Sequence, residues 1–281
     1  MKVLVAGGRG MLGQDMVSAL SENHEVFAPQ RNELDLMDRG MIVDCLAAYC
    51  PDVVVNCAAY VQVDKAEEEI AQAYAVNAFG AQNIALAAAK QGCALCHVGT
   101  DYVFDGSKKM FTPFDQTNPL NVYGMSKLAG EWYVRWALNR FYIVRTSWLY
   151  GKHGNNFVDA ILKKATSGED LKVVHDQIGA PTWTVSLAAA LKMLIETEAY
   201  GVYHYTDDSD KGVSWYDFAI EILRQSGLDR NVLPIATSEF PRPATRPQRS
   251  TLECSLIEML GIKREAWKDS LGRYLEVKSR Q

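Results

Sequence analysis

The chain has 281 residues, of which 48% are hydrophobic and 22% are charged, and its formal net charge is −5. This is the composition of a globular protein with enough chain to bury a large core. A sequence pI of about 5.6 argues against nucleic acid as a partner, because phosphate binding requires a basic surface. There is no run of about eighteen apolar residues and no signal-peptide pattern, so we expect a cytoplasmic protein without a membrane span.

Two of the six cysteines, Cys93 and Cys96, form a C-x-x-C pair. Such a pair can belong to a zinc site or a redox centre. Here it flanks an apolar run that predicts a buried strand, in which residues three apart point to opposite faces. No second C-x-x-C completes a ligand set. We therefore interpret the cysteines as small buried residues of a thiol-reduced, intracellular chain, and we predict no metal site from them.

The first half of the chain alternates between strand and helix patterns. The strands are continuous apolar runs, which is typical of burial on both faces of a parallel sheet. We therefore predict a doubly wound, Rossmann-type α/β fold. The predicted strands are 2–6, 26–28, 53–55, 94–98 and 141–144, and the predicted helices are 11–20, 41–48 with Asp38 as N-cap, 71–90 and 123–138.

The second half is less regular. Its pattern predicts helices at 156–166, 185–197, 216–226 and 255–275, and a proline-rich stretch at 234–247 that excludes regular helix. We expect residues 1–150 to form a dinucleotide-binding domain that also recruits part of 178–200. Residues 151–281 are then mainly a smaller α/β substrate-binding domain. The expected site is the cleft between them, beyond the carboxyl ends of the strands.

A glycine-rich segment, Gly7-Gly-Arg-Gly10-Met-Leu-Gly13, follows the first predicted strand. Glycine permits a sharp turn and the close approach of a pyrophosphate, which binds at the amino terminus of the next helix. Three glycines alone are weak evidence, but their place between a strand and a helix predicts a dinucleotide cofactor.

The end of the second strand indicates which dinucleotide to expect. NAD-specific folds usually place an acidic residue there for the ribose 2′-hydroxyl. Here the segment 27–31 has no acid, and the first ones are Glu33 and Asp35. Arg9 and Arg31 could instead pair with a 2′-phosphate. We therefore prefer NADPH to NADH, with solvated arginines as the alternative.

Tyr123 and Lys127 are four residues apart at the start of a predicted helix, so their side chains share one face. An ammonium beside the phenol is expected to lower the tyrosine pKa, which makes the tyrosine a usable general acid for a carbonyl that receives hydride. Thr100, at the end of the preceding strand, can polarise the same carbonyl. These three residues predict a ketone reductase.

Together these motifs resemble an extended short-chain dehydrogenase/reductase and, more closely, the dTDP-4-dehydrorhamnose reductase family. The resemblance covers nearly the whole chain in ordered blocks, which is specific. The blocks are Asn56-Cys-Ala-Ala-Tyr60, Val63-Asp-Lys-Ala-Glu67, Thr100-Asp-Tyr-Val-Phe-Asp-Gly106, Pro119-Leu-Asn-Val-Tyr-Gly124, Lys127-Leu-Ala-Gly-Glu131, Arg145-Thr-Ser-Trp148, Gly154-Asn-Asn-Phe157, Asp176-Gln-Ile-Gly-Ala-Pro-Thr182 and Arg242-Pro-Ala-Thr-Arg-Pro247.

The resemblance implies NADPH- or NADH-dependent reduction of the 4-keto group of dTDP-6-deoxy-L-lyxo-4-hexulose to dTDP-L-rhamnose, a precursor of cell-wall polysaccharide. It implies that Tyr123 is the proton donor, that Lys127 supports it and binds the nicotinamide ribose, and that Thr100 bonds the keto oxygen or the tyrosine. With the motifs above, the expected cofactor contacts are Gly7, Gly10, Met11, Leu12, Arg31, Asp35, Leu36, Ala58, Ala59, Tyr60, Val98, Tyr123 and Lys127. The expected substrate contacts are Thr100, Asp101, Tyr102 and Trp148, with Asn156 and Gln177 as weaker candidates.

Some alternatives stay open at this point. In related dehydratases an Asp-Glu pair follows the strand-end threonine, whereas this chain has Asp101-Tyr102, which favours a simple reductase. Gly99 replaces a usual serine of the family, and Val61 a usual threonine. A regulatory subunit resembling the methionine adenosyltransferase β subunit, or a reductase of another nucleotide-linked 4-keto sugar, would also fit. Mg²⁺ is implied by the family resemblance only, and a monomer and a homodimer are equally compatible with the sequence.

Overall fold

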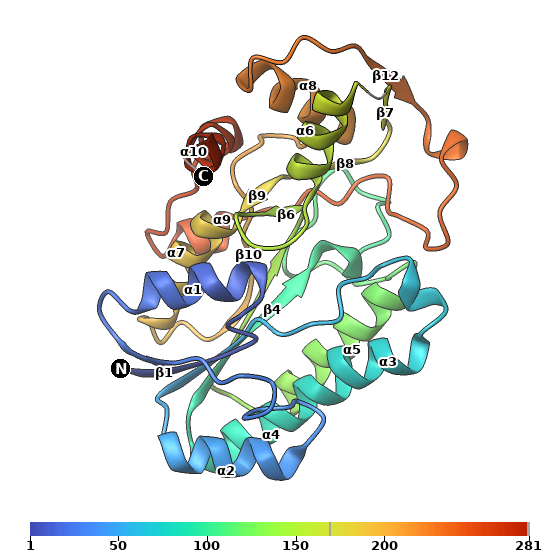
Figure 1. Cartoon of the computed structure of the whole chain (residues 1–281). Helices are drawn as coiled ribbons and strands as arrows, with labels where there is room; N and C mark the ends of the chain where they lie inside the picture. Colours follow the sequence, from blue (N-terminus) through green and yellow to red (C-terminus); the bar gives the residue numbers. More distant parts are fainter. Residues whose placement is uncertain (169, 280–281) are drawn as a thin grey trace.

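The computed structural model describes residues 1–168 and 170–279 (Figure 1). Its centre is a six-stranded, all-parallel sheet with the strand order β10-β5-β4-β3-β1-β2. The predicted doubly wound α/β fold is therefore confirmed. The six strands are β1 (Lys2–Ala6), β2 (Glu25–Phe27), β3 (Val53–Asn56), β4 (Ala94–Thr100), β5 (Phe141–Thr146) and β10 (Gly201–His204).

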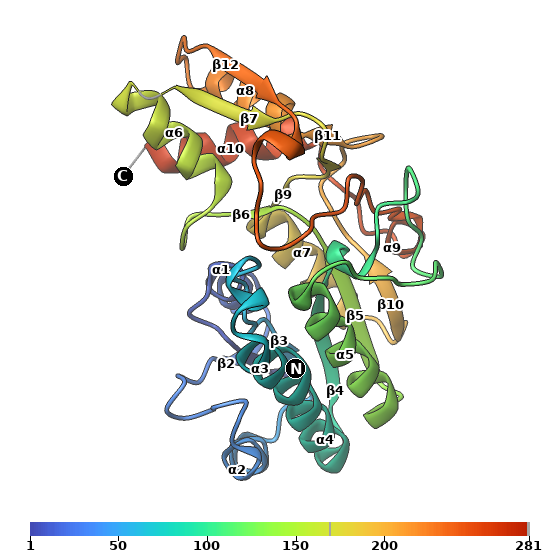
Figure 2. The ribbon, with the colours of Figure 1, turned by 90° about the vertical axis from the view of Figure 1, so that its right-hand side faces the viewer.

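Helices cover both faces of this sheet (Figures 1 and 2). Val3 and Val5 of β1 face one hydrophobic core and Leu4 faces the other, which explains why the strand is apolar throughout. We call the sheet and the helices on its two faces the sheet half. On one face α1 (Met11–Leu20) packs against α7 (Thr184–Ile195), and on the other lie α2 (Arg39–Tyr49), α4 (Ala81–Gln91) and α5 (Val122–Ala137).

The predicted helix 71–90 is helical throughout but changes type along its length. It consists of α3 (Ile70–Tyr74), a π-helical turn η2 (Ala75–Gly80) and α4. At η2 the neighbouring helix α5 comes unusually close, since a Cβ on Gly130 would lie 2.2 Å from the backbone O of Asn77. The π turn therefore lies where the backbones of two helices come close together.

A second lobe has its own core, in which Tyr150, Phe218 and Trp267 are buried. It lies above the sheet half in Figure 1. Its sheet pieces are two-stranded: β7 (Leu171–Val174) with β12 (Val232–Ile235), β8 (Ile178–Gly179) with β11 (Val213–Ser214), and β6 (Leu149–Tyr150) with β9 (Thr182–Trp183). Its helices are α6 (Phe157–Ser167), α8 (Trp215–Gln225) and α10 (Trp267–Ser279). Short helices elsewhere are η1 (Lys65–Glu67), η3 (Asp101–Val103), η4 (Thr237–Glu239) and α9 (Ser255–Glu258).

The predicted helix 255–275 is wrong as one element. The short helix α9 ends at Glu258, Gly261 adopts a φ of +82°, and α10 begins only at Trp267. Ile257 and Ile262 belong to the core of the sheet half, whereas Trp267 and Leu271 belong to the core of the second lobe. The apolar residues of 255–275 follow helical spacing, but those before and after the break between α9 and α10 pack into two different cores.

The cysteines lie as the strand pattern predicts. Cys93 joins the core on one face of the sheet and Cys96 the core on the other, and all six cysteines are free thiols. Within residues 1–168 and 170–279, no three histidine, cysteine, aspartate or glutamate side chains are grouped as a metal site would need, so the Mg²⁺ suggestion has no structural support. The same residues include no helix that is long and apolar enough to cross a bilayer.

Candidate active site

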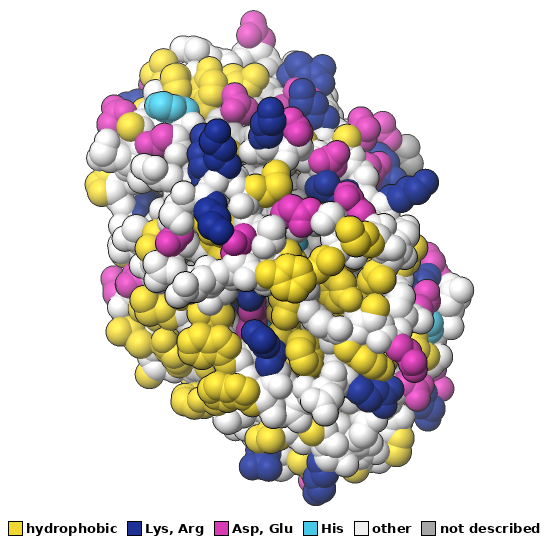
Figure 3. All heavy atoms as spheres, turned by 180° about the vertical axis from the view of Figure 1, so that it is seen from behind, with side chains coloured by type: hydrophobic (Ala, Val, Ile, Leu, Met, Phe, Trp, Pro, Cys, Tyr) yellow, Lys and Arg dark blue, Asp and Glu magenta, His cyan; other side chains and the backbone are white. Residues whose placement is uncertain are grey.

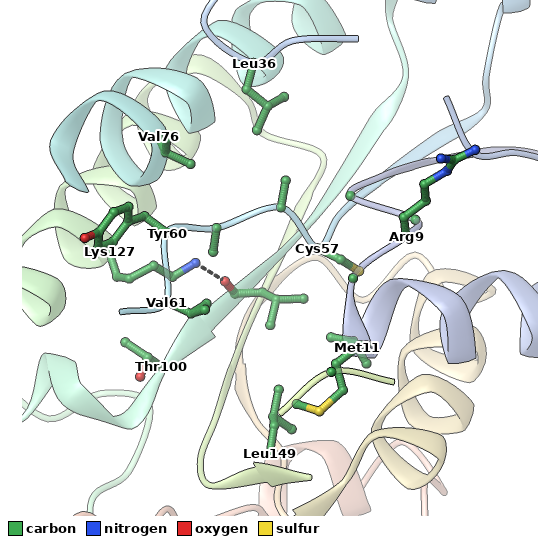
Figure 4. A pocket seen from close by; sticks show the side chains of 18 of the residues that line it. Arg9, Met11, Leu36, Cys57, Tyr60, Val61, Val76, Thr100, Lys127 and Leu149 are labelled. Atoms are coloured by element: carbon green, nitrogen blue, oxygen red, sulfur yellow. Dashed lines mark hydrogen bonds between the residues drawn. The ribbon is translucent and has the colours of Figure 1, made fainter. Parts of the chain in front are cut away.

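A cavity of about 880 Å³ opens at the carboxyl ends of the sheet strands (Figure 4). Part of its wall directly follows β1 and β3, the neighbouring strands at which the strand order reverses. Open parallel sheets bind their ligands in this position. The structure brings together in this wall the residues Gly7, Gly10, Met11, Leu12, Arg31, Asp35, Leu36, Ala58, Ala59, Tyr60, Val98, Thr100, Asp101, Tyr123, Lys127 and Trp148.

The turn after β1 is shaped by close backbone approach. Gly7 has a φ of +76°, and a Cβ on it would lie 2.7 Å from the backbone N of Ala58. A Cβ on Gly13 would lie 2.1 Å from the backbone O of Gly7. Gly10 is the N-cap of α1 and offers no side-chain oxygen to the amides of its first turn. Those amides and the positive end of the helix fit a pyrophosphate, so the residues present suit a dinucleotide.

The two arginines considered for a 2′-phosphate both line the cavity. Arg9 lies at the end remote from Thr100 and Lys127 (Figure 4). The side chain of Arg31 is 80% exposed, and its Nε lies 3.6 Å from Oδ2 of Asp35. That exposed pair is weak, so Arg31 can turn toward an added phosphate at small cost.

Thr100, Tyr123 and Lys127 meet at the other end of the cavity. Thr100 is the last residue of β4, and Tyr123 and Lys127 project from the first turns of α5, which Asn121 caps. Lys127 is 3% exposed, and its Nζ donates to the backbone O of Val98 over 2.6 Å (dashed line in Figure 4). The strand end and the helix start therefore place a hydroxyl, a phenol and an ammonium around one region.

The pKa of Tyr123 corrects one part of the expected chemistry. The sequence suggests that Lys127 lowers the pKa of Tyr123. In the structure, burial raises this pKa to about 12, and a hydrogen bond with the Thr100 hydroxyl offsets only part of the increase. Burial also lowers the pKa of Lys127 to about 8, against the opposing charge of Glu131. Tyr123 is therefore protonated at neutral pH, which is the state that a proton donor needs.

Asp101 is a buried carboxyl in the cavity wall, 2% exposed. Burial raises its pKa to about 7, with hydrogen bonds from Ser250 and Thr100 opposing the shift. Near neutral pH this group is present in both protonation states. It can therefore accept or donate a hydrogen bond to a hydroxyl in the cavity.

Trp148 contributes an indole ring to the cavity wall. Its backbone has a φ of +47°, an uncommon value for a bulky residue. Its ring stacks on Trp215 with centroids 3.4 Å apart and planes 7° apart. A Cβ on Gly179 would lie 2.4 Å from Cε2 of Trp148, so glycine leaves the space that the indole occupies. The stack holds a strained residue in place at the cavity.

Three of the expected site residues lie outside the cavity wall. Tyr102 packs edge-on against Tyr123, with ring centroids 5.8 Å apart. Asn156 is the N-cap of α6, and Gln177 donates to Oγ1 of Thr237 over 3.1 Å. Direct contact of these three side chains with a substrate stays a prediction.

Other parts of the wall were missed from the sequence. Gln72 and Val76 reach the cavity because α3 and η2 pack beside α5, and no local motif signals that packing. The remaining unpredicted wall residues include Cys57, Thr146, Ser147, Leu149, Gly154 and Asn155, which adjoin motif residues in the chain. Their position in or beside the sequence motifs could therefore have identified these residues as part of the site.

The structure shows the surroundings of Gly99 and Val61, the two residues that depart from the family pattern. A Cβ on Gly99 would lie 2.7 Å from Oε1 of Glu131, whose carboxylate pairs with Arg145 over 2.7 Å in the interior. Glycine thus leaves space for a buried ion pair. Val61 is 66% exposed and lines the cavity, so its methyl groups replace a possible hydrogen-bonding hydroxyl there.

A Rossmann-type sheet, a glycine turn at its switch point and a Thr/Tyr/Lys group in the same cavity define a nicotinamide-dependent reductase of the short-chain type. The family model described as the RmlD substrate binding domain matches residues 1–279, and the chain belongs to this family. The resemblance to dTDP-4-dehydrorhamnose reductases is thereby confirmed.

Individual relatives agree over nearly the full length. The chain is 39% identical to a dTDP-4-dehydrorhamnose reductase of Aggregatibacter actinomycetemcomitans, over 96% of this chain and 97% of the relative. A crystal structure of a dTDP-4-dehydrorhamnose reductase ortholog from Clostridium acetobutylicum matches with a TM-score of 0.96 and 42% identity, over 99% of this chain and 100% of that one. The Bacillus anthracis enzyme, solved in complex with NADP, matches with a TM-score of 0.95 and 36% identity, over 98% and 99% of the two chains.

Proposed function

We propose that the protein reduces the 4-keto group of dTDP-6-deoxy-L-lyxo-4-hexulose to give dTDP-L-rhamnose, with NADPH as the preferred coenzyme. One observation carries this proposal: a single cavity joins the glycine turn to Thr100, Tyr123 and Lys127. Relatives of the same length that carry the reductase name support the choice of substrate.

The residues divide the chemistry among them. When bound, the reduced nicotinamide supplies the hydride that adds to the keto carbon. Tyr123 donates its phenolic proton to the keto oxygen, and the Thr100 hydroxyl holds that oxygen in place. Lys127, as an ammonium, holds the cofactor ribose and offsets the negative charge left on the phenol.

The second lobe is proposed as the sugar-nucleotide-binding domain. Trp148 would offer a flat wall to the deoxysugar, and Asp101 a hydrogen bond to one of its hydroxyls. Asn155 and Leu149, in the wall at the border between the lobe and the sheet half, would bound the rest of the substrate. The six free thiols support the expected cytoplasmic location, where thiols stay reduced.

The preference for NADPH rests on Arg9 and Arg31 in the cavity wall, with Arg9 at the end remote from Thr100 and Lys127. The NADP bound in the Bacillus anthracis relative supports it. Neither observation favours the regulatory-subunit alternative. A different nucleotide-linked ketone is the second candidate substrate, because a dTDP-4-keto-6-deoxy-D-glucose reductase of Streptomyces niveus is 38% identical over 89% of this chain.

A turnover assay with two coenzymes and two sugars tests the proposal. The purified protein is given NADPH or NADH together with dTDP-6-deoxy-L-lyxo-4-hexulose or dTDP-4-keto-6-deoxy-D-glucose, and coenzyme oxidation is followed. We expect the highest kcat/KM for NADPH with the L-lyxo sugar. Equal or better turnover of the D-glucose derivative would overturn the substrate assignment, and no oxidation with either sugar would overturn the reductase itself.

A further inference from the structure

A cross-link between the two parts of the chain lies beside the start of α5, outside the cavity wall. Asp64 precedes η1 and accepts hydrogen bonds from the Arg246 guanidinium at 2.6 Å to Oδ1 and 2.9 Å to Oδ2. Nη2 of Arg242 lies 2.9 Å from Oδ2, and the backbone N of Ala244 donates to Oδ1 over 3.3 Å. We call these four residues the Asp64 clasp. Figures 1 and 2 show the segment after β12 reaching toward the start of α3.

The bond between Asp64 and Arg246 is more than a loose surface pair. Its two side chains are only 25% and 15% exposed. The hydrogen bond from Arg246 is the main cause that lowers the pKa of Asp64, so the carboxylate is charged throughout the neutral range. A two-point guanidinium–carboxylate bond fixes direction as well as distance. Arg242, in contrast, is 47% exposed and lies over the Phe240 ring.

Two backbone contacts connect the clasp to the first turn of α5. Glu67, in the same turn as Asp64, accepts a hydrogen bond from the backbone N of Val122 over 2.9 Å. Asn121, the N-cap of α5, donates to the backbone O of Thr245 over 2.8 Å. Thr245 lies between two residues of the clasp. The two residues before Tyr123, Asn121 through its side-chain amide and Val122 through its backbone N, are therefore held by segments that Asp64 joins.

A third link runs through side chains. Arg246 interacts electrostatically with Tyr102, and the Tyr102 ring packs edge-on against Tyr123. No residue of the clasp is itself part of the cavity wall. The clasp thus contacts the start of α5 and Tyr102, the neighbour of Tyr123, but does not line the cavity.

We propose that Asp64 and Arg246 are positioning residues for Tyr123, which aim its phenol at the keto oxygen when segment 242–246 is seated against the sheet half. The proposal rests on the proposed function, in which Tyr123 is the proton donor. Proton transfer depends steeply on geometry, and an error of about 1 Å can cost on the order of 10²-fold in rate. The clasp therefore couples the seating of a segment that follows β12 of the second lobe to catalysis in the sheet half.

The test measures kcat, both KM values, NADPH affinity and Tm for Asp64→Asn, Arg246→Lys and Arg246→Gln. We expect kcat to fall by about 10- to 100-fold, with the NADPH Kd and the KM of the sugar nucleotide within about threefold of wild type. Arg246→Lys keeps the charge and a Tm near wild type but loses the two-point bond, so its kcat still falls. The double variant Asp64→Asn/Arg246→Gln should lose no more than the worse single variant.

Two controls make the outcomes decisive. Arg242→Gln removes the exposed arginine of the same clasp and should leave kcat within about twofold. Lys192→Gln removes an ion pair to Glu22 that also joins distant segments, and shows the effect of a lost cross-link elsewhere. If kcat merely follows Tm across all variants, or if only the sugar-nucleotide KM rises, the positioning role is overturned. Active Tyr123→Phe protein would instead overturn the proposed function, so the two failures are distinct.

Discussion

Two regions of the cavity wall are built by different means. Around the glycine turn, which we propose binds the cofactor, backbone atoms line the wall, and a Cβ on Gly7 would collide with the backbone of Ala58. Around Trp148, which we propose contacts the sugar, a side chain lines the wall and is held by stacking on Trp215. We call these two regions the cofactor end and the sugar end. In the proposed function the first contacts the pyrophosphate that all such dinucleotides share, and the second depends on a few replaceable side chains. Change of substrate within such a fold is therefore expected at the Trp148 end, with the glycine end retained.

The hydrophobic surface shows a further contrast between the two regions. In Figure 3, exposed hydrophobic side chains gather on the lower half of the molecule, which is the sheet half. Trp136 of α5 is 75% exposed, while the large aromatic residues Phe218 and Tyr274 of the second lobe are buried. Phe218 and Tyr274 belong to the second lobe's own core.

The largest effect is expected at Tyr123, the proposed proton donor. Tyr123→Phe removes the proton donor but keeps the ring that packs against Tyr102, so kcat should fall by about 10² to 10⁴-fold. NADPH affinity, measured by fluorescence titration, should change little. Wild-type turnover by this variant would exclude Tyr123 as the acid.

The backbone character of the cofactor end is tested by a matched pair of glycines. Gly7 and Gly92 both have positive φ, +76° and +74°, but a Cβ on Gly92 would have no atom within 4 Å, whereas a Cβ on Gly7 would have one at 2.7 Å. Alanine at either position adds strain on the order of 1 kcal/mol. Only Gly7→Ala should also weaken NADPH binding, by at least about tenfold, in a titration. Equal affinity of both variants would contradict a backbone-built cofactor wall.

The side-chain character of the sugar end is tested by removing the support of Trp148. Trp215→Leu or Gly179→Ala should displace the indole and raise the KM of the sugar nucleotide by about tenfold. The NADPH Kd should stay the same, which separates the two ends. Steady-state kinetics with each substrate varied in turn gives both quantities, and a matching loss in both would show that the ends are not independent.

A pH-dependent stability is expected at the junction of the two regions. Asp207 follows β10, is fully buried, and accepts a hydrogen bond from the backbone N of Trp183 over 3.0 Å. Burial raises its pKa from 3.8 to about 7. The folded state therefore binds the proton more tightly than the unfolded chain, so the stability is fully present below about pH 4 and is lost as the pH rises through about 7.

Asp207→Asn keeps the acceptor for Trp183 but cannot titrate. Urea unfolding at a series of pH values should show a free energy of unfolding that falls less steeply with pH than in wild type, by up to about 1.4 kcal/mol per pH unit between 4 and 7. Asp101 keeps a slope of the same sign in both proteins. Identical slopes for the two proteins would contradict the assignment to Asp207.

The smallest effect is expected at the exposed arginine of the cofactor end. Arg31→Ala should weaken NADPH binding by about three- to tenfold, since exposed charges contribute little, and should leave NADH binding unchanged. The comparison of the two coenzymes is its own control. Equal loss of both would mean that Arg31 does not meet a 2′-phosphate.

The contrast between the two ends also decides what the sequence could predict. Buried parallel strands such as β1 and β4 are continuous apolar runs, and the glycine turn and the Tyr123–Lys127 spacing are local signals. The two-residue strands of the second lobe carry no such signal, and the short edge strand β10 was missed as well. In 255–275 the apolar spacing serves two cores, which local periodicity cannot distinguish from a helix.

The candidate site also combines features that the sequence predicts with features that depend on tertiary packing. Trp148 was placed only through the family resemblance, because an isolated tryptophan is more often a core residue. Gln72 and Val76 depend on how α3 packs against α5, and the raised pKa of Tyr123 depends on burial that spacing does not reveal. Sequence motifs predict the candidate reactive groups, whereas tertiary packing decides their environment.

In the proposed reaction, hydride passes in this cavity from NADPH to the sugar ketone while Tyr123 supplies the proton. The most direct measurement uses NADPH that carries deuterium at the transferred position of the nicotinamide, with dTDP-6-deoxy-L-lyxo-4-hexulose, and locates the label in the product by NMR. We expect one deuterium on C4 of a dTDP-L-rhamnose product with the wild-type protein, and almost none in the same time with Tyr123→Phe. A product without deuterium at C4, or no product from the wild-type protein, would contradict the proposed reaction.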